Sequence, residues 1–272
     1  MKKRIVVIGI HGPYEPWKSI LMNGQAETWM DSFPNLRIIS VFGRGINQKL
    51  MKFDKWTYYL RWSEIKFVAY SALLFEMILK STINLDRYRP NVIRSQNHKL
   101  GDIWEFQMPD SLMLQGVKNL AAFRESLNLE YDFLVTTISS SYLNLSLLKE
   151  FLEQVKPENF VGGRIEKSGD MKYQQGSFRV YSRDVVENLV SHSRHYKHWK
   201  IEDIAMGALT TSLYSEFTEM PNMTIQSVSD VENISNEELG RIISYRCKST
   251  MNGARKDAEV MHSLHNRLFL EC

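Results

Sequence analysis

The chain has 272 residues, of which 43% are hydrophobic and 24% charged, and its formal net charge is +3. These values are ordinary for a soluble globular protein, and the net charge is too small to indicate nucleic-acid binding. The two cysteines, Cys247 and Cys272, form neither a disulfide framework nor a metal-type spacing, which suits a reducing compartment. The longest apolar runs are too short for a signal-sequence core or a membrane span, so we expect a cytoplasmic protein.

Apolar runs and helical spacings alternate along the chain. They predict strands at 4–10, 36–42, 133–137 and 178–181, and helices at 24–33, 112–123, 147–155, 185–190, 202–213 and 254–268. Asn144 or Ser146 is the expected N-cap of the helix at 147–155. Short apolar strands between helices are typical of a parallel sheet covered on both faces. Because no linker or repeat interrupts the alternation, we expect one α/β domain over residues 1–272, with a mixed, mostly parallel sheet flanked by helices.

We expect a helical insertion over residues 46–99. Aromatic and cationic side chains interleave at 52–62, and a helical stretch follows to about Lys80. One interpretation is an amphipathic helical pair that packs on the domain. The other is a platform that contacts an acceptor or a membrane surface peripherally.

The apolar strand at 133–137 ends in a polar turn, Ile138-Ser139-Ser140, and a helix follows. Short motifs surround this turn in chain order. They are Thr28-Trp29 with the strand at 37–43, Gly101-Asp102-Ile103, Asp110-Ser111 with Lys118, the stretch 133–144, Phe160-Val161-Gly162-Gly163, Gly176 with Ser182-Arg183-Asp184, and Glu202-Asp203-Ile204 with Gly207. Together they resemble the motifs of the β-1,3-galactosyltransferase and Fringe family of inverting GT-A glycosyltransferases. The resemblance covers residues 28–207 and implies a GT-A-like fold.

Three features depart from that family's pattern. The turn that carries the family's metal-binding Asp-x-Asp motif reads Ile138-Ser139-Ser140 here, without either carboxylate. Ala26 and Glu27 stand where the family places an arginine before Thr-Trp, and residues 46–99 are longer than the family's connection. These departures concern metal use, donor contacts and acceptor identity, respectively.

The resemblance implies that Asp203 is a general base, because it matches the aspartate of the family's Glu-Asp-Val motif. A carboxylate within hydrogen-bond reach of an acceptor hydroxyl removes its proton, and a base opposite the leaving group implies inversion. The alternative is that Glu202 and Asp203 only complement the dipole of the helix that they begin. The implied donor is a nucleotide sugar, by default a UDP-hexose, and the acceptor is a glycan or lipid-linked glycan.

The diphosphate leaving group needs positive charge, which a divalent cation supplies in the metal-using family. Without the two carboxylates we expect no metal cofactor, and protein cations in its place. The candidate cations are Arg44, Arg164, Arg246, Lys248, Arg255 and Lys256. The last four lie in residues 240–272, a segment that we expect to close over the donor. His262 and His265 lie three residues apart and offer a weaker, alternative metal site.

Further donor contacts are expected where the first strand ends, because ligands in open α/β sheets bind beyond the carboxyl ends of strands. His11, Gly12 and Pro13 lie there, and Gly12 lets the backbone approach a base or ribose closely. The resemblance adds Asp102, Lys118 and the turn at 138–140 to the donor site. To the acceptor site it adds Gly162, Gly163, Gly176 and Glu202.

Structural roles and other functions stay open. Asp102 could instead form a cap or an ion pair, and Lys118 could be a solvated helix residue. A catalytically inactive relative would bind nucleotide, glycan or a protein partner, although the retained Glu202 and Asp203 argue against it. A plain nucleotide-binding protein ranks third, because the chain has neither Gly-x-Gly-x-x-Gly nor a phosphate-loop lysine motif.

Overall fold

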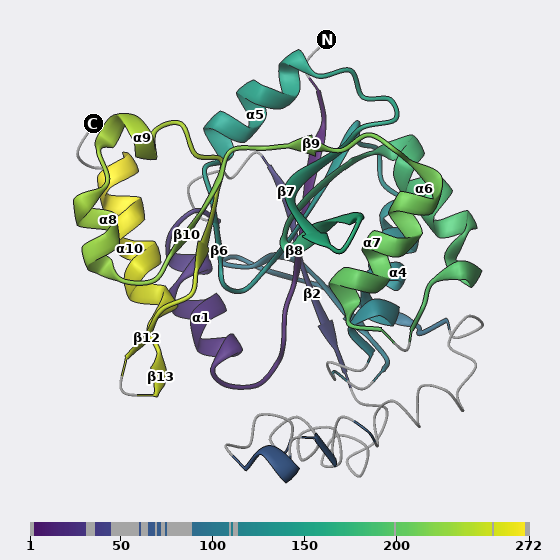
Figure 1. Ribbon diagram of the computed structural model, residues 1–272, viewed down its shortest axis with the longest axis horizontal. Coiled ribbons are helices and arrows are strands. Elements are labelled where there is room, and N and C mark those ends of the chain that lie inside the picture. The colour runs from purple at the N-terminus through teal and green to yellow at the C-terminus, as the bar shows by residue number, and fades with distance from the viewer. Residues whose placement is uncertain are drawn as a thin grey trace.

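A computed structural model describes residues 3–30, 36–44, 60, 65–68, 70–71, 74, 89–108, 110, 114–198, 200–251 and 253–269. Its centre is an eight-stranded sheet with the strand order β3-β4-β2-β1-β5-β8-β7-β9, and helices flank this sheet (Figure 1). The predicted α/β architecture is therefore confirmed.

Most of the elements are short. The strands of the large sheet are β1 (Ile5–Ile10), β2 (Arg37–Gly43), β3 (Val92–Asn97), β4 (Gly101–Phe106), β5 (Phe133–Ile138), β7 (Val161–Ser168), β8 (Met171–Ser182) and β9 (Thr218–Glu219). The helices are α1 (Trp17–Asn23), α4 (Gln115–Ser126), α5 (Leu145–Gln154), α6 (Arg183–Ser191), α7 (Glu202–Leu213), α8 (Val228–Asn233), α9 (Asn236–Leu239) and α10 (Asp257–Phe269). A three-stranded sheet contains β6 (Ser141–Leu143), β10 (Asn222–Ile225) and β11 (Ser244–Cys247), and β12 (Thr250–Met251) pairs with β13 (Ala254–Arg255).

The sheet is mixed but mostly parallel, as predicted. Strands β4, β2, β1 and β5 are parallel neighbours, whereas β3 pairs antiparallel with β4. Strand β8 runs antiparallel to both β5 and β7, and β9 is parallel to β7. The carboxyl ends of the four parallel neighbours therefore meet at one edge, where ligands bind in open α/β sheets.

Each face of the sheet has its own hydrophobic core. Along β1, Ile5 and Val7 pack with α1, α5 and α10, whereas Val6 and Ile8 pack with α4, α6 and α7. This alternation follows from the period of two in a strand, and it makes every β1 side chain apolar. Figure 1 shows α4, α6 and α7 together on one side of the sheet and α1, α8, α9 and α10 on the other.

Two expected elements differ from the structure. In place of the helix expected at 24–33, an α-helix lies earlier, at Trp17–Asn23, and ends at Gly24, where a Cβ atom would lie 2.4 Å from the carbonyl oxygen of Ile20. A short 3₁₀ helix follows at Gln25–Glu27, and residues 31–33 lie outside the described residues. Most of the insertion expected at 46–99 lies outside the described residues, and its last part forms strand β3 rather than a helix.

Within the described ranges, no helix has the length and apolarity that crossing a membrane requires.

Helix α5 begins at the predicted cap. Asn144 Oδ1 accepts a hydrogen bond of 3.2 Å from the backbone N–H of Leu147, and Leu148 and Leu152 then enter the core. We expect Asn144→Ala to lower the free energy of unfolding by about 1 kcal/mol, because one helical N–H loses its partner. Asn144→Ser is the matched control and should recover most of that loss in denaturant unfolding. Equal stabilities for the Ala and Ser variants would contradict the capping role.

Candidate functional site

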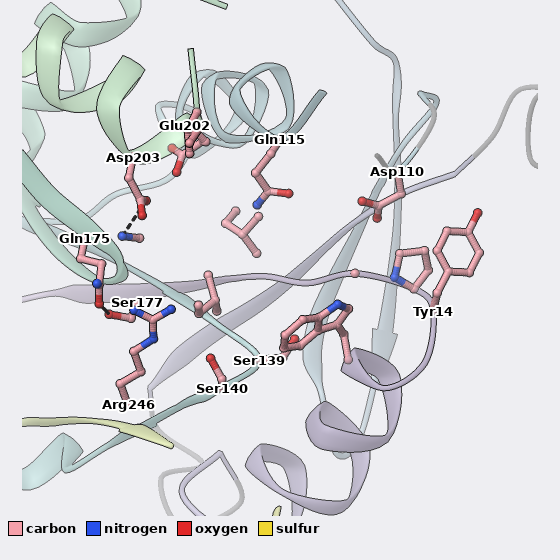
Figure 2. A pocket seen from close by; sticks show the side chains of 17 residues that line it. Tyr14, Asp110, Gln115, Ser139, Ser140, Gln175, Ser177, Glu202, Asp203 and Arg246 are labelled. Carbon is pink, nitrogen blue, oxygen red and sulfur yellow. Dashed lines mark hydrogen bonds between the residues drawn. The ribbon is translucent and has the colours of Figure 1, made fainter. Parts of the chain in front are cut away.

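A cavity of about 240 Å³ opens at the carboxyl ends of β1 and β5 (Figure 2). Gly12 and Pro13 follow β1, and the turn at 138–140 follows β5. The remaining lining comes from the last residue of β1, from the first residues of α1, α4 and α7 and those just before them, and from β8 and β11. These residues are Ile10, Tyr14, Trp17, Asp110, Gln115, Gln175, Gly176, Ser177, Ile201, Glu202, Asp203 and Arg246. The cavity therefore lies where the sequence predicted a donor site.

A buried arginine holds two carboxylates at one wall of this cavity. Arg179, on β8, has a side chain that is 1% exposed. Its two terminal nitrogens donate to the two oxygens of Glu202 at 2.7 and 2.8 Å, and Nη2 also donates to Asp203 at 2.7 Å. Asn119, on α4, donates to Glu202 as well. Burial opposes ionisation of Glu202, but the Arg179 guanidinium outweighs it and lowers the pKa of Glu202.

Asp203 is the more available of the two carboxylates. Its side chain is 34% exposed, against 12% for Glu202, and it faces the cavity (Figure 2). Its Oδ1 accepts a hydrogen bond of 2.9 Å from the backbone N–H of Gly176. Burial, together with the negative charge of Glu202, raises the pKa of Asp203 to about 6. A carboxylate with this pKa is basic enough to take a proton at neutral pH.

Gly176 permits this arrangement because it has no side chain. A Cβ atom at this position would lie 2.7 Å from Oδ1 of Asp203 and 3.3 Å from Nη2 of Arg179. The backbone of β8 therefore lies closer to the Asp203 carboxylate than a residue with a Cβ atom would allow. Glu202 and Asp203 also stand in the first turn of α7, so they complement the helix dipole while they form the cavity wall.

A second buried ion pair lies behind the ends of β1 and β2. Lys118 Nζ donates to Asp110 at 2.6 Å and to the carbonyl oxygen of His11 at 2.7 Å. The other oxygen of Asp110 accepts from the backbone N–H of Gly43 at 2.7 Å. His11 Nδ1 lies 3.0 Å from the hydroxyl of Ser139. Burial, with Lys118 nearby, lowers the pKa of His11 to about 3, so the imidazole is neutral.

This arrangement changes two expected donor contacts. Neither His11 nor Lys118 lines the cavity, because both side chains are buried beneath it. Lys118 is buried, so the alternative expectation of a solvated helix residue is wrong. Instead, these residues hold the two strand ends and Ser139 in place, while Asp110, their ionic partner, contributes to the wall.

Three further candidates lie away from the cavity. Asp102 is at the amino end of β4, the opposite edge of the sheet, where it accepts from Arg37 Nε at 2.9 Å and from Gln96 at 3.0 Å. Its ion-pair alternative is therefore correct. Gly162 and Gly163 are buried in β7, where a Cβ on Gly162 would meet Phe160 and one on Gly163 would meet Phe178. The glycine pair is thus packed within β7 and does not line the cavity.

The structure separates the candidate cations of the C-terminal segment. Arg246, on β11, lines the cavity, whereas Lys248 is exposed outside it. Arg255 pairs with the buried Asp257 and stacks on the ring of Trp17, with 4.8 Å from guanidinium to ring centroid. Lys256 pairs with Glu259. The segment therefore contributes β11 to the cavity, while α10 packs in the core.

Arg44 and Arg164 are outside the wall, and both have carboxylate partners. Arg44 pairs with Glu105 at 3.3 Å, and Arg164 pairs with Glu166 at 3.2 Å.

The two histidines of α10 face different groups. His262 Nε2 lies 2.7 Å from the carbonyl oxygen of Asn23, and His265 Nδ1 lies 3.0 Å from the hydroxyl of Tyr142. Among the residues that the structure describes, no three His, Cys, Asp or Glu side chains are grouped to hold a metal ion.

Several residues of this site were not among the candidates from the sequence, and Arg179, Gln115 and Trp17 show why. Arg179 interrupts the apolar run from Phe178 to Tyr181, and a charge inside a buried strand could have signalled an internal ion pair. Gln115 and Trp17 line the cavity but belong to no motif, so only the fold brings them there.

Comparison with the models of known protein families and with curated proteins finds no match. Sequence relatives therefore contribute nothing to the assignment of a function, and the cavity itself must support one.

Replacing Asp203 by Asn is expected to preserve or raise the melting temperature at about pH 8. The pKa of Asp203 in the folded protein lies above its ordinary value, so the folded state binds this proton more tightly than the unfolded chain. Ionisation of Asp203 therefore costs stability as the pH rises between about 4 and 6, and the cost persists above that range. Asn removes the cost and keeps the oxygen that accepts from Gly176.

Asp230→Asn is the matched control, with the opposite sign. Backbone hydrogen bonding from Gln226 lowers the pKa of Asp230, so its ionised form stabilises the fold at neutral pH and this contribution is lost in acid. In thermal unfolding, the advantage of Asp203→Asn over the wild type should be larger at about pH 8 than at about pH 4.5. A lower melting temperature for Asp203→Asn at both pH values would contradict the description of Asp203 as a destabilised carboxylate.

Proposed function

We propose that this protein is an inverting glycosyltransferase of GT-A-like architecture, which moves a sugar from a nucleotide donor to a hydroxyl group of a glycan or lipid-linked glycan. The observation that carries the proposal is Asp203, a carboxylate with a raised pKa that faces a cavity at the carboxyl ends of parallel strands. The motif resemblance supports the same assignment, since its Glu-Asp pair coincides with the two carboxylates in the wall.

The proposed reaction is a single displacement at the anomeric carbon. Asp203 takes the proton from the acceptor hydroxyl as the acceptor oxygen forms its bond to that carbon. The bond from the anomeric carbon to the phosphate oxygen breaks, and its electron pair leaves with the nucleoside diphosphate. Attack opposite the leaving group inverts the configuration. A retaining enzyme would instead need a nucleophile and a second step.

The size and lining of the cavity agree with the sugar and phosphate part of such a donor. At about 240 Å³ the cavity is smaller than the roughly 300–1,000 Å³ of sites that enclose a drug-sized ligand. It therefore suits a sugar ring and its phosphates better than a whole nucleotide sugar. Trp17 and Tyr14 line the cavity, and aromatic side chains are suited to stacking on a base or sugar.

Asp203→Asn is expected to lower the rate of transfer at least about 100-fold, because general base catalysis contributes roughly 10²- to 10⁴-fold. Donor affinity should stay within a few fold, since Asn keeps the contact with Gly176. The measurement is release of nucleoside phosphate from a panel of nucleotide sugars with glycan acceptors. For the wild type, kcat/KM should rise with pH through an apparent pKa of about 6, as Asp203 loses its proton.

Asp230→Asn serves again as control, because this carboxylate also begins a helix but lies outside the cavity. It should leave the transfer rate unchanged. Near-normal turnover by Asp203→Asn would overturn the proposed base. Binding of donors without any turnover, across the whole panel, would favour the alternative of a catalytically inactive relative.

A lipid-linked acceptor would place the protein at a membrane surface. In the described part of residues 46–99, the apolar side chains of Phe67, Tyr70 and Leu74 are 80, 69 and 60% exposed. Aromatic and apolar groups of this kind insert into the interface of a bilayer.

We therefore expect the chain to sediment with vesicles that contain anionic lipid, and the double variant Phe67→Ala/Tyr70→Ala to lose most of this binding. Met251→Ala is the control, because Met251 is similarly exposed, at 61%, on a different element. Equal sedimentation of both variants and the wild type would contradict a membrane role for this segment.

A further inference from the structure

Arg246 is a cation at the cavity that forms no ion pair with the described residues. Of the described residues in the wall, it alone carries a positive charge. Its Nε is buried and has no hydrogen-bond partner among the residues that the structure describes. Figure 2 shows the guanidinium of Arg246 extending from β11 into the cavity, on the side of Ser140 and away from Asp110.

The negative charges of the wall are largely satisfied elsewhere. Asp110 is paired with Lys118, and Glu202 is held by both terminal nitrogens of Arg179. Asp203 also has its own contact with Arg179. Arg246 therefore faces the cavity without an ion pair to any described carboxylate, and the charges of Asp203 and Glu166 only partly offset the cost of burying it.

A second arginine lies on the same side of the small sheet. In the pairing of β10 with β11, Thr224 is the register partner of Arg246, so their side chains project from the same face. Arg164, from β7, donates to the hydroxyl of Thr224 at 2.6 Å. Burial, with Arg164 close by, lowers the pKa of Arg246. Arg164 and Arg246 thus lie close to each other, and an anion bound in the cavity would reduce the repulsion between them.

The polar turn after β5 completes the surroundings of Arg246. The backbone N–H of Cys247 donates to the carbonyl oxygen of Ser140 at 2.8 Å, and Arg246 itself pairs with Ser141 across the strands. The turn at 138–140 is therefore bound to the strand that carries Arg246. It offers the hydroxyl of Ser140 to the cavity and no carboxylate that could pair with the arginine.

We propose that Arg246, with the Ser140 hydroxyl beside it and Arg164 behind it, forms a phosphate subsite that holds the diphosphate of a nucleotide without a bridging divalent cation. The identity of the diphosphate as part of a sugar donor rests on the proposed function, whereas phosphate binding does not. A guanidinium matches phosphate oxygens with two parallel N–H donors, and such charge-assisted bonds are short and strong.

This subsite supplies what departure of the leaving group requires. As the bond from the anomeric carbon to oxygen breaks, the terminal phosphate gains one negative charge. Arg246 compensates that charge from a fixed position at the wall, so its contact strengthens as the reaction proceeds. Arg164 forms an ion pair with Glu166, so its charge is already partly neutralised and it stabilises the leaving group less than Arg246 does.

The test is calorimetric binding of inorganic pyrophosphate and of UDP, GDP, CDP and dTDP to the full chain in the presence of a chelator. We expect pyrophosphate and at least one nucleotide to bind the wild type. Arg246→Met should weaken both at least about 10-fold, since hydrogen bonds to charged groups contribute roughly 1.5–3 kcal/mol. The affinity for the corresponding nucleoside should stay the same, which shows that the variant is folded and that the effect belongs to the phosphates.

Two further variants sharpen the test. Ser140→Asp introduces a carboxylate next to Arg246 and should weaken pyrophosphate binding as strongly as Arg246→Met, whereas Ser140→Ala should cost only a few fold. Arg44→Met is the matched control, because Arg44 is a surface arginine paired with Glu105 outside the cavity. It should bind pyrophosphate like the wild type.

The outcomes separate this subsite from the proposed function. Binding that needs a divalent cation and does not change in Arg246→Met overturns the subsite, and so does a lack of any binding in chelator. Sugar transfer could depend on Asp203, be lost on chelation and be unaffected in Arg246→Met. That result would support the glycosyltransferase and contradict the phosphate subsite. Chelator-resistant pyrophosphate binding that requires Arg246, without transfer from any donor, leaves the subsite standing and removes the transferase.

Discussion

The buried guanidinium of Arg179 is the constraint on which the cavity depends. A side chain that is 1% exposed and positively charged requires carboxylate partners, and both come from the first turn of α7. The Arg179 guanidinium therefore fixes the start of α7 against β8. Asn119, on α4, donates to the carboxylate of Glu202 as well. Because Glu202 accepts from both terminal nitrogens, Asp203 keeps only a single contact with the arginine. Because Arg179 makes two hydrogen bonds to Glu202 and one to Asp203, the carboxylate of Asp203 stays open to the cavity.

The cavity uses two arginines in opposite ways. Arg179 is neutralised by its two carboxylates and is structural, whereas Arg246 forms no ion pair with the described residues and faces the cavity. Asp203 and Arg246 come from α7 and β11, elements on different faces of the site (Figure 2). A substrate between them meets a proton acceptor and an anion-binding group, a polarity that suits cleavage of a bond toward an anionic leaving group.

The sequence predicted those features that repeat locally. The all-apolar run of β1 indicated a strand buried on both faces, and Glu202–Leu213 was predicted as a helix with its actual bounds. Gly24 was misread because a glycine that ends one helix resembles one that precedes another, and only the close approach of Ile20 distinguishes them. Asp102 was misplaced because a motif does not say at which end of a strand it lies. Arg179 escaped notice because its partners are more than 20 positions away.

The small sheet has a consequence for the order in which the protein matures on the ribosome. Among the described strands, β6, next to the turn at 138–140, pairs only with β11, which belongs to the small sheet and ends at Cys247. The large sheet is nearly complete once β8 has emerged at Ser182, but one wall of the cavity then has no partner. At a synthesis rate of about 5–20 residues per second, the missing strand follows several seconds later. A nascent chain can thus pair most strands of the large sheet first, but it can form this wall of the cavity only after β11 has been synthesised.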